Sequence, residues 1–170
     1  MKTITESGMI FGPFDDGEIF HIEQSNLYQF LAKGVKSIEF IYSPQKNVIL
    51  FVEAKSSSPR LDNNIDFDGF ISDISNKLIH SLELYISAYI GIHGDKKQEI
   101  PDMFAKIDWE DAKIKFLLVI NGHKEEWLLP IIDGLNRVML PQKKIWNMEI
   151  AVANETIATE LHLGTPEKFA

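Results

Sequence analysis

The chain of 170 residues contains no cysteine. Disulfide bonds, thiol nucleophiles and zinc sites built from thiolates are therefore excluded. No apolar stretch is long enough to span a bilayer, and the opening residues, MKTITESGMIFGPFDDGE, lack the apolar segment of a signal peptide. We therefore expect a cytoplasmic protein that makes no use of a membrane.

Arginine is also scarce, with only Arg60 and Arg137, and the formal net charge is −8. Because phosphate binding depends mostly on lysine and arginine, this composition disfavours a broad surface that coats nucleic acid. The charge is uneven, however. Residues 33–60 hold five bases and two acids, whereas residues 1–32 hold one base and five acids. A local contact with nucleic acid is therefore compatible with the sequence.

Several catalytic and cofactor motifs are missing. The chain has no GxxxxGK[ST] or GxGxxG phosphate loop and no GxSxG nucleophile turn. Its five histidines show neither HxxxH nor HxH spacing, so they give no indication of a histidine metal site. These patterns therefore give no indication of a phosphate-binding loop, a nucleophile turn or a histidine metal site.

The hydrophobic pattern predicts strands and helices in alternation. A DDG turn at 15–17, between SGMIFGPF and EIFHIEQ, predicts an opening β-hairpin. Helices are expected at 26–33 (capped by Ser25 and followed by Gly34), at 68–90 (capped by Asp66 or Asp68) and at 125–140, with Pro141 just beyond. Strands are expected at 37–43, 47–55, 113–121, 147–153 and 156–163, and residues 95–112 are expected to be irregular with one helical turn. We therefore expect a single α/β domain, residues 1–170, with a mixed central β-sheet flanked by helices.

One hairpin brings charged residues together. Side chains alternate along a strand, so Glu53 and Lys55 share a face. If the hairpin between 37–43 and 47–55 closes symmetrically about Lys46, residue 39 lies opposite residue 53, and residue 39 is Glu39. Their Cβ atoms would then lie roughly 5 Å apart. The arithmetic predicts two carboxylates and one ammonium group on one face.

Such a cluster suits a divalent cation. Two close carboxylates repel each other and raise the pKa of at least one of them, and a bound cation removes that repulsion. Mg²⁺ prefers a few carboxylate oxygens together with waters and a substrate phosphate. Lys55 would stand beside the attacking water and stabilise developing negative charge.

The segment IEFIYSPQKNVILFVEAK resembles the core of the PD-(D/E)xK nuclease superfamily, which has the restriction-endonuclease-like fold. The resemblance implies a nuclease-like core at about residues 25–125, Glu39 as the first acid and Glu53-Ala54-Lys55 as the ExK motif. It implies that Glu39, Glu53 and the Ala54 carbonyl hold Mg²⁺ or Mn²⁺, that Glu53 and Lys55 are catalytic, and that the substrate is DNA or RNA. Glu23 is the nearest candidate for the acid that the family often carries on its first helix.

The sequence departs from the family at two points. Glu39 stands where the family normally has aspartate, and only two strands are predicted between residues 33 and 68, where the family has three. Either the N-terminal hairpin supplies the third strand or the helix at 26–33 is wrong.

Two functions stay open at this point. The first is a metal-dependent phosphodiesterase, that is, a nuclease. The second is a catalytically inactive nuclease-like module that binds or regulates protein partners or forms a homo-oligomer. For Glu53 and Lys55 alone, an exposed ion pair at the end of a strand is the simpler interpretation.

Overall fold

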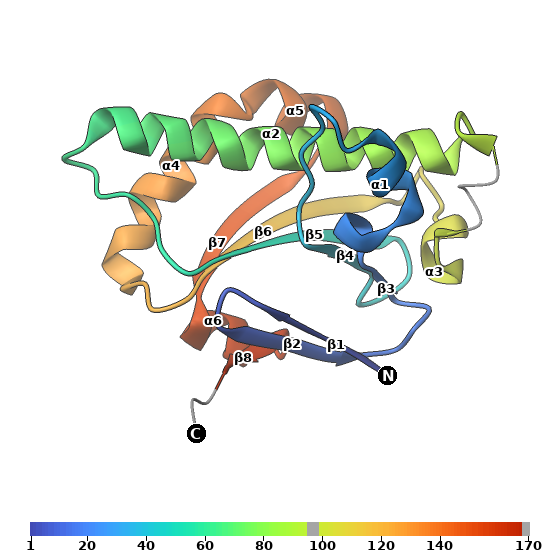
Figure 1. Cartoon of the computed structure of the whole chain (residues 1–170), viewed down its shortest axis with the longest axis horizontal. Coiled ribbons are helices and arrows are strands. Elements are labelled where there is room, and N and C mark those ends of the chain that lie inside the picture. The colour runs from blue at the N-terminus through green and yellow to red at the C-terminus, as the bar shows by residue number, and fades with distance from the viewer. Residues whose placement is uncertain (95–98, 168–170) are drawn as a thin grey trace.

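The computed structural model describes residues 1–94 and 99–167, and these form a mixed α/β structure with two sheets. Helices cover one face of a five-stranded sheet, and a smaller three-stranded sheet faces its other side (Figure 1). In these two ranges, no helix is both long enough and apolar enough to cross a bilayer.

The larger sheet combines an antiparallel and a parallel half. Its strand order is β3 (Ile19–Phe20), β4 (Phe40–Tyr42), β5 (Val48–Lys55), β6 (Lys113–Ile120) and β7 (Glu149–Asn154). Strands β3, β4 and β5 pair antiparallel, whereas β5, β6 and β7 pair parallel. Strand β5 is therefore the boundary between the two halves, with one antiparallel and one parallel neighbour.

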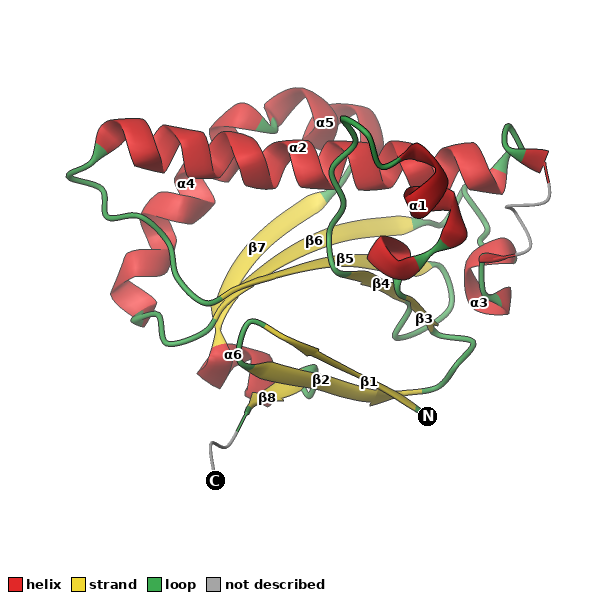
Figure 2. Cartoon of the chain, in the orientation of Figure 1, coloured by secondary structure: helices red, strands yellow, loops and turns green. Residues whose placement is uncertain are grey.

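The helices connect these strands (Figure 2). Their bounds are α1 (Asn26–Leu31), α2 (Asn64–Tyr89), α3 (Asp102–Ala105), α4 (Leu128–Val138), α5 (Leu140–Trp146) and α6 (Glu155–Glu160). The short 3₁₀ turns η1 (Ile22–Gln24) and η3 (Glu125–Trp127) precede α1 and α4. Parallel strands need a crossover, and α2 makes it from β5 to β6, while α4 and α5 make it from β6 to β7. Both crossovers lie on the same face of the sheet (Figure 2).

The smaller sheet has the order β1 (Lys2–Glu6), β2 (Met9–Phe14) and β8 (Gly164–Pro166). Strands β1 and β2 form a tight hairpin in which Glu6 pairs with Met9. The two turn residues, Ser7 and Gly8, both have positive φ (53° and 75°), as the tightest hairpin turn requires. This sheet packs on the face of β5 that points away from the helices.

Alternation along β5 divides the core into two layers. Ile49 and Phe51 belong to the cluster beneath the helices, whereas Val52 and Ala54 belong to the cluster between the two sheets. Both layers are apolar, and β5 is buried on both faces. Glu53 follows Phe51 on the helix side, so its carboxylate lies in the layer between β5 and α2.

Several predicted elements are confirmed, and the strand at 37–43 is shorter than expected. Helices 26–33 and 68–90 and strands 47–55, 113–121 and 147–153 are present as α1, α2, β5, β6 and β7 within a few residues. Ser25 caps α1 as predicted, accepting a hydrogen bond from the Tyr28 N–H. Helix α2 is instead capped by Asn63, which accepts from the Asp66 N–H. Of the irregular segment 95–112, residues 95–98 lie outside the described residues, and α3 supplies the helical turn.

Three expectations are wrong. The chain between β2 and β3 does turn near 15–17, but these strands belong to different sheets, and the opening hairpin turns at Ser7 and Gly8. Residues 156–163 contain helix α6 and no strand, because the Asn154 side chain caps this helix by accepting from the Ile157 N–H. The helix expected at 125–140 is replaced by η3, α4 and a separate α5, in whose first turn Pro141 lies.

Candidate active site between the β4–β5 hairpin and helix α2

The hairpin register agrees with the sequence arithmetic. Phe40 pairs with Val52 and Tyr42 with Leu50, so paired residue numbers sum to 92, the sum that places 39 opposite 53. Glu39 directly precedes β4, at the position that faces Glu53. The structure therefore brings the two predicted carboxylates to the same place, beneath α2.

Helix α2 holds the chain that leads into Glu39. The Ser81 hydroxyl accepts a hydrogen bond from the Ile38 N–H at 2.9 Å, and Nδ1 of His80 accepts from the Lys36 N–H at 3.0 Å. Ser81 is buried. Because both contacts come from one helix, the backbone before Glu39 is fixed against the element that covers the site.

Glu53 is the centre of the charged cluster. Its side chain is 0% exposed, and its Oε1 lies 2.7 Å from Lys55 Nζ and 2.7 Å from Lys77 Nζ. Its other oxygen, Oε2, is buried and has no hydrogen-bond partner. Lys77 Nζ also lies 4.0 Å from Glu39 Oε1, so its ammonium group lies near both carboxylates.

Burial and mutual repulsion shift the pKa values of both acids. Burial and the nearby Glu53 carboxylate raise the pKa of Glu39 from 4.5 to about 8, and Glu23 and Glu6 add to this rise. Burial also raises the pKa of Glu53, although Lys77 and Lys55 counteract part of that shift. Burial is the largest single influence on Lys77 and disfavours its charged form, but the interactions with Glu53, Glu39 and Lys55 together raise the pKa of Lys77. Repulsion between the two carboxylates thus favours a proton on Glu39, whereas Lys77 and Lys55 favour the charged form of Glu53.

Lys77 is the residue that sequence reasoning missed. It is the only lysine or arginine in α2, and it stands three residues after Ile74 and four before Ser81, two residues on the buried side of the helix. A single base at helical spacing from buried positions indicates a buried acid on the facing element. Its side chain is only 17% exposed, as that spacing implies.

Ala54 and Glu23 also lie at this site. The Ala54 side chain points to the sheet–sheet layer, and its carbonyl oxygen accepts a hydrogen bond from the Ser7 hydroxyl at 3.1 Å. Asn121 Nδ2 donates to the carbonyl oxygens of Ser7 and Gly8 at 3.2 and 3.1 Å. The β1–β2 turn is thereby fastened to the ends of β5 and β6. Glu23, from η1, shares a hydrogen bond with Glu39, so the weakest of the sequence candidates adjoins the cluster.

The residues fit a cation held by few protein ligands. Within residues 1–94 and 99–167, no three side chains of His, Cys, Asp or Glu stand at a spacing that encloses a metal ion. Mg²⁺, however, commonly uses one or two carboxylates and completes its shell with waters and phosphate oxygens. The unpartnered Oε2 of Glu53 and the nearby Glu39 carboxyl group supply oxygen atoms of that kind.

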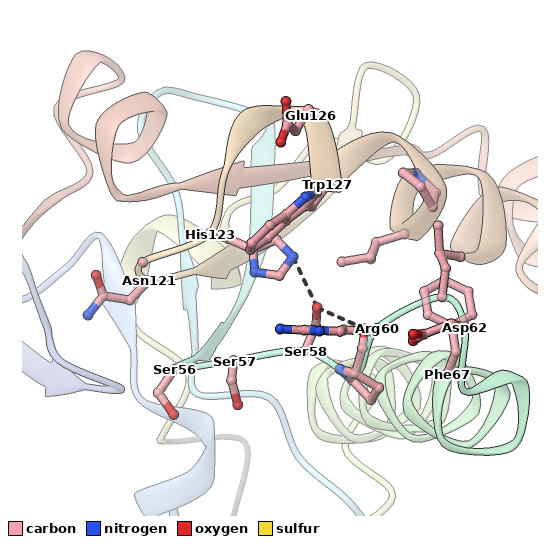
Figure 3. A pocket seen from close by; sticks show the side chains of 15 residues that line it. Ser56, Ser57, Ser58, Arg60, Asp62, Phe67, Asn121, His123, Glu126 and Trp127 are labelled. Atoms are coloured by element: carbon pink, nitrogen blue, oxygen red, sulfur yellow. Dashed lines mark hydrogen bonds between the residues drawn. The ribbon is translucent and has the colours of Figure 1, made fainter.

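A cavity of about 660 Å³ lies beside this cluster, where β5 and β6 end. Its lining includes Ser56–Ser58, which directly follow Lys55, and Asn121–His123, which follow β6 (Figure 3). Ligands of α/β sheets commonly bind at the carboxyl ends of parallel strands. The strand that carries Glu53 and Lys55 thus leads from the charged cluster directly into a concave surface.

The raised pKa of Glu39 predicts a pH dependence of stability in metal-free buffer. A glutamate with an ordinary pKa loses its proton near pH 4.5 in the unfolded chain, whereas folded Glu39 keeps it up to about pH 8. The folded state therefore binds more protons in this window, and the free energy of unfolding falls as the pH rises through it. After discounting for solvent screening, we expect a loss of about 2 kcal/mol from this group between pH 5 and 9.

Urea denaturation at several pH values, with EDTA present, measures this effect. Glu39→Gln is expected to remove the loss and to be more stable than the wild type at pH 9. Glu149→Gln is the matched control, because its lysine partner Lys115 lowers the pKa of Glu149 and it does not titrate in this window. Equal pH slopes in the wild type and Glu39→Gln would contradict the raised pKa.

No protein family, no curated protein and no solved structure matches the chain. The functional conclusion therefore depends on the geometry of this cluster and of the cavity beside it.

Proposed function

We propose that the protein is a metal-dependent phosphodiesterase that hydrolyses DNA or RNA, built on a restriction-endonuclease-like fold. The observation that carries this proposal is Glu53, a fully buried carboxylate with one unpartnered oxygen, lying beside Glu39 and bound to the lysine two residues further along its strand. The chain runs from the β4–β5 hairpin through the long helix α2 to the parallel strand β6, and this order supports the fold assignment. Strand β3 adds a third antiparallel strand to the hairpin.

Each residue has a defined role in this proposal. Glu39 and Glu53 would hold Mg²⁺ or Mn²⁺, and the Ala54 carbonyl would be a further ligand if the Ser7 hydroxyl released it. When bound, the cation supplies charge that stabilises the pentavalent phosphorus and the leaving oxygen. Glu39 has to lose its proton to act as a ligand, which a cation promotes by lowering its pKa.

Lys55 acts on the attacking water and the phosphate. Its side chain is 28% exposed, whereas the Glu53 side chain is fully buried, so Lys55 is the partner of this pair that solvent reaches. Lys55 orients the water that attacks phosphorus and stabilises the charge on the phosphate oxygens as the P–O ester bond breaks. The attacking water releases a proton to solvent as its oxygen bonds to phosphorus, and the leaving oxygen takes up a proton from solvent. Lys77 keeps Glu53 ionised from the opposite side.

Cleavage of labelled nucleic acid tests the proposal. Single- and double-stranded DNA and RNA are incubated with the protein and Mg²⁺ or Mn²⁺, with EDTA as the control. We expect cleavage of at least one substrate that requires the cation and is lost in Glu53→Ala. If no substrate is cleaved with either cation, or if Glu53→Ala cleaves at the wild-type rate, the catalytic proposal fails.

One observation favours a second function. Lys77 already neutralises Glu53 and lies within 4.0 Å of Glu39, so the cluster is electrostatically satisfied without a cation. A module that has kept the fold and uses lysine in place of the metal would bind nucleic acid or a protein partner without hydrolysis. This alternative predicts that the protein binds no divalent cation at the site.

A further inference from the structure

The cavity at the ends of β5 and β6 has an apolar interior and one aromatic wall. Phe67 from α2 and Pro130 and Ile131 from α4 supply apolar surface. Trp127, at the end of η3, is 46% exposed. A large indole that stays half exposed in a concave site offers a ring face to a planar ligand.

Neighbouring residues fix the orientation of this tryptophan. The His123 ring packs edge-on against Trp127, with centroids 5.2 Å apart, and the Lys124 ammonium lies 5.1 Å from the Trp127 ring centroid. The loop that carries both residues is held in place from β7 and α6. Asn154 Nδ2 donates to the His123 carbonyl at 3.0 Å, and the Gly122 N–H donates to Glu155 Oε2 at 2.8 Å. The stacking surface is therefore built before any ligand arrives.

Two polar groups lie next to the aromatic wall. Ser58 Oγ lies 3.0 Å from His123 Nε2, and Figure 3 shows Ser58 directed toward His123 across the cavity. Burial lowers the pKa of His123, so its imidazole is neutral at pH 7. A neutral imidazole and a hydroxyl can each donate or accept a hydrogen bond, which suits the mixed donors and acceptors on the edge of a heterocycle.

The cavity is joined to the charged cluster by the chain itself. Ser56 directly follows Lys55, and Ser56, Ser57 and Arg60 are exposed at the rim. A phosphate group at Lys55 would thus lie beside hydroxyl groups and a guanidinium group along the way to the Trp127 face. Hydroxyl and guanidinium groups are common phosphate contacts in nucleic-acid complexes.

We propose that this cavity binds one unpaired nucleobase of a single-stranded DNA or RNA, stacked on Trp127 and hydrogen-bonded at its edge by Ser58 and His123. The inference rests on the proposed phosphodiesterase function and names its substrate class. A volume of about 660 Å³ holds a nucleoside but not a duplex, whose bases would first have to leave the stack. Stacking needs no base-specific contact, so it tolerates sequence and does not require a broad basic surface, which the net charge of −8 disfavours.

Fluorescence anisotropy with a labelled 12-nucleotide single strand, in EDTA so that no cleavage occurs, tests this proposal. We expect Trp127→Ala to weaken binding of the single strand about tenfold and to leave binding of the matching duplex unchanged. Leu129→Ala is the matched control, because Leu129 is 62% exposed at the start of α4 and does not line the cavity. It should bind as the wild type does.

An oligonucleotide with the same backbone but abasic sugars separates stacking from phosphate contacts. The wild type should bind it about tenfold more weakly than the normal strand, and Trp127→Ala should bind both strands equally. A single strand that binds the wild type and Trp127→Ala with the same affinity, or no binding of the single strand at all, overturns the inference. The cleavage assay is scored separately, so a protein that binds through Trp127 and does not cleave would refute the proposed hydrolysis while supporting this cavity.

Discussion

Lys55→Ala is expected to lower the rate of nucleic-acid cleavage by roughly 10² to 10³-fold, the usual effect of removing one group that stabilises developing charge. Lys55 is the more exposed of the two lysines in the cluster, so we expect it to be the one that contacts a substrate phosphate. The fold should persist in this variant, because Lys77, the less exposed of the two lysines and the one that also lies near Glu39, still pairs with the buried Glu53 carboxylate.

Lys115→Ala is the control for this comparison. Lys115 also lies on a strand of the larger sheet and forms a 2.8 Å ion pair, with Glu149, but it is 41% exposed and lies in the first half of β6, away from the strand end that adjoins the cluster. Initial rates at saturating substrate should be unchanged by its loss. A Lys55→Ala rate within twofold of the wild type, in a protein with an unchanged melting temperature, would remove Lys55 from the reaction.

Lys77→Met is expected to destabilise the folded protein by about 3 kcal/mol at pH 7, because Lys77 lies near both buried carboxylates and its loss leaves only the more exposed Lys55 beside Glu53. Methionine keeps most of the apolar volume of the lysine side chain, so packing against the sheet is largely conserved. The cost should shrink at pH 5, since Glu53 can then take up a proton and the buried charge disappears.

Lys36→Met supplies the comparison for Lys77→Met. Lys36 forms an ion pair with Asp73, which lies in α2 as Lys77 does. Both side chains of this pair are at least 40% exposed. Surface ion pairs of this kind contribute less than about 1 kcal/mol. Urea denaturation of both variants at pH 5 and pH 7 measures the difference. If Lys77→Met costs no more than Lys36→Met at pH 7, the buried pair does not hold the site together.

The hairpin geometry followed from the sequence because it depends on two local rules. Side chains alternate along a strand, and a short turn fixes which residues face each other, so the position of Glu39 relative to Glu53 needed only residue numbers. The burial of Glu53 is less local. It depends on the packing of α2 over β5, and the residues next to Glu53 in the sequence do not determine that packing.

Lys77 lies 24 residues from Glu53, and their contact depends on the crossover that packs α2 on the sheet. The sequence of α2 did indicate this contact, because Lys77 is the single base at helical spacing from the buried positions of the helix. Periodicity gives the face of a helix, but the facing residue has to come from the packing of two elements.

The misplaced elements reflect competing local signals. Residues 156–163 alternate as a strand would, yet Asn154 and Glu155 supply a cap and an acidic first turn, and the helix formed. Pro141 was interpreted as a stop, although proline fits equally well in the first turn of a new helix, as in α5. The cavity could not be predicted because Ser58, Trp127 and Phe67 meet only through the tertiary structure.

The central claim is that Glu39 and Glu53 form a divalent-cation site, and a calorimetric titration of the purified protein with Mn²⁺ tests it most directly. Glu53→Gln keeps the shape of the side chain and removes its charge, so it is the matched variant. We predict one Mn²⁺ bound per wild-type chain, with affinity at least tenfold weaker in Glu53→Gln, and with Lys77→Met retaining the binding. Absence of Mn²⁺ binding at millimolar concentration in the wild type, or equal affinity in Glu53→Gln, would contradict the account and leave Lys77 as the permanent counterion of the pair.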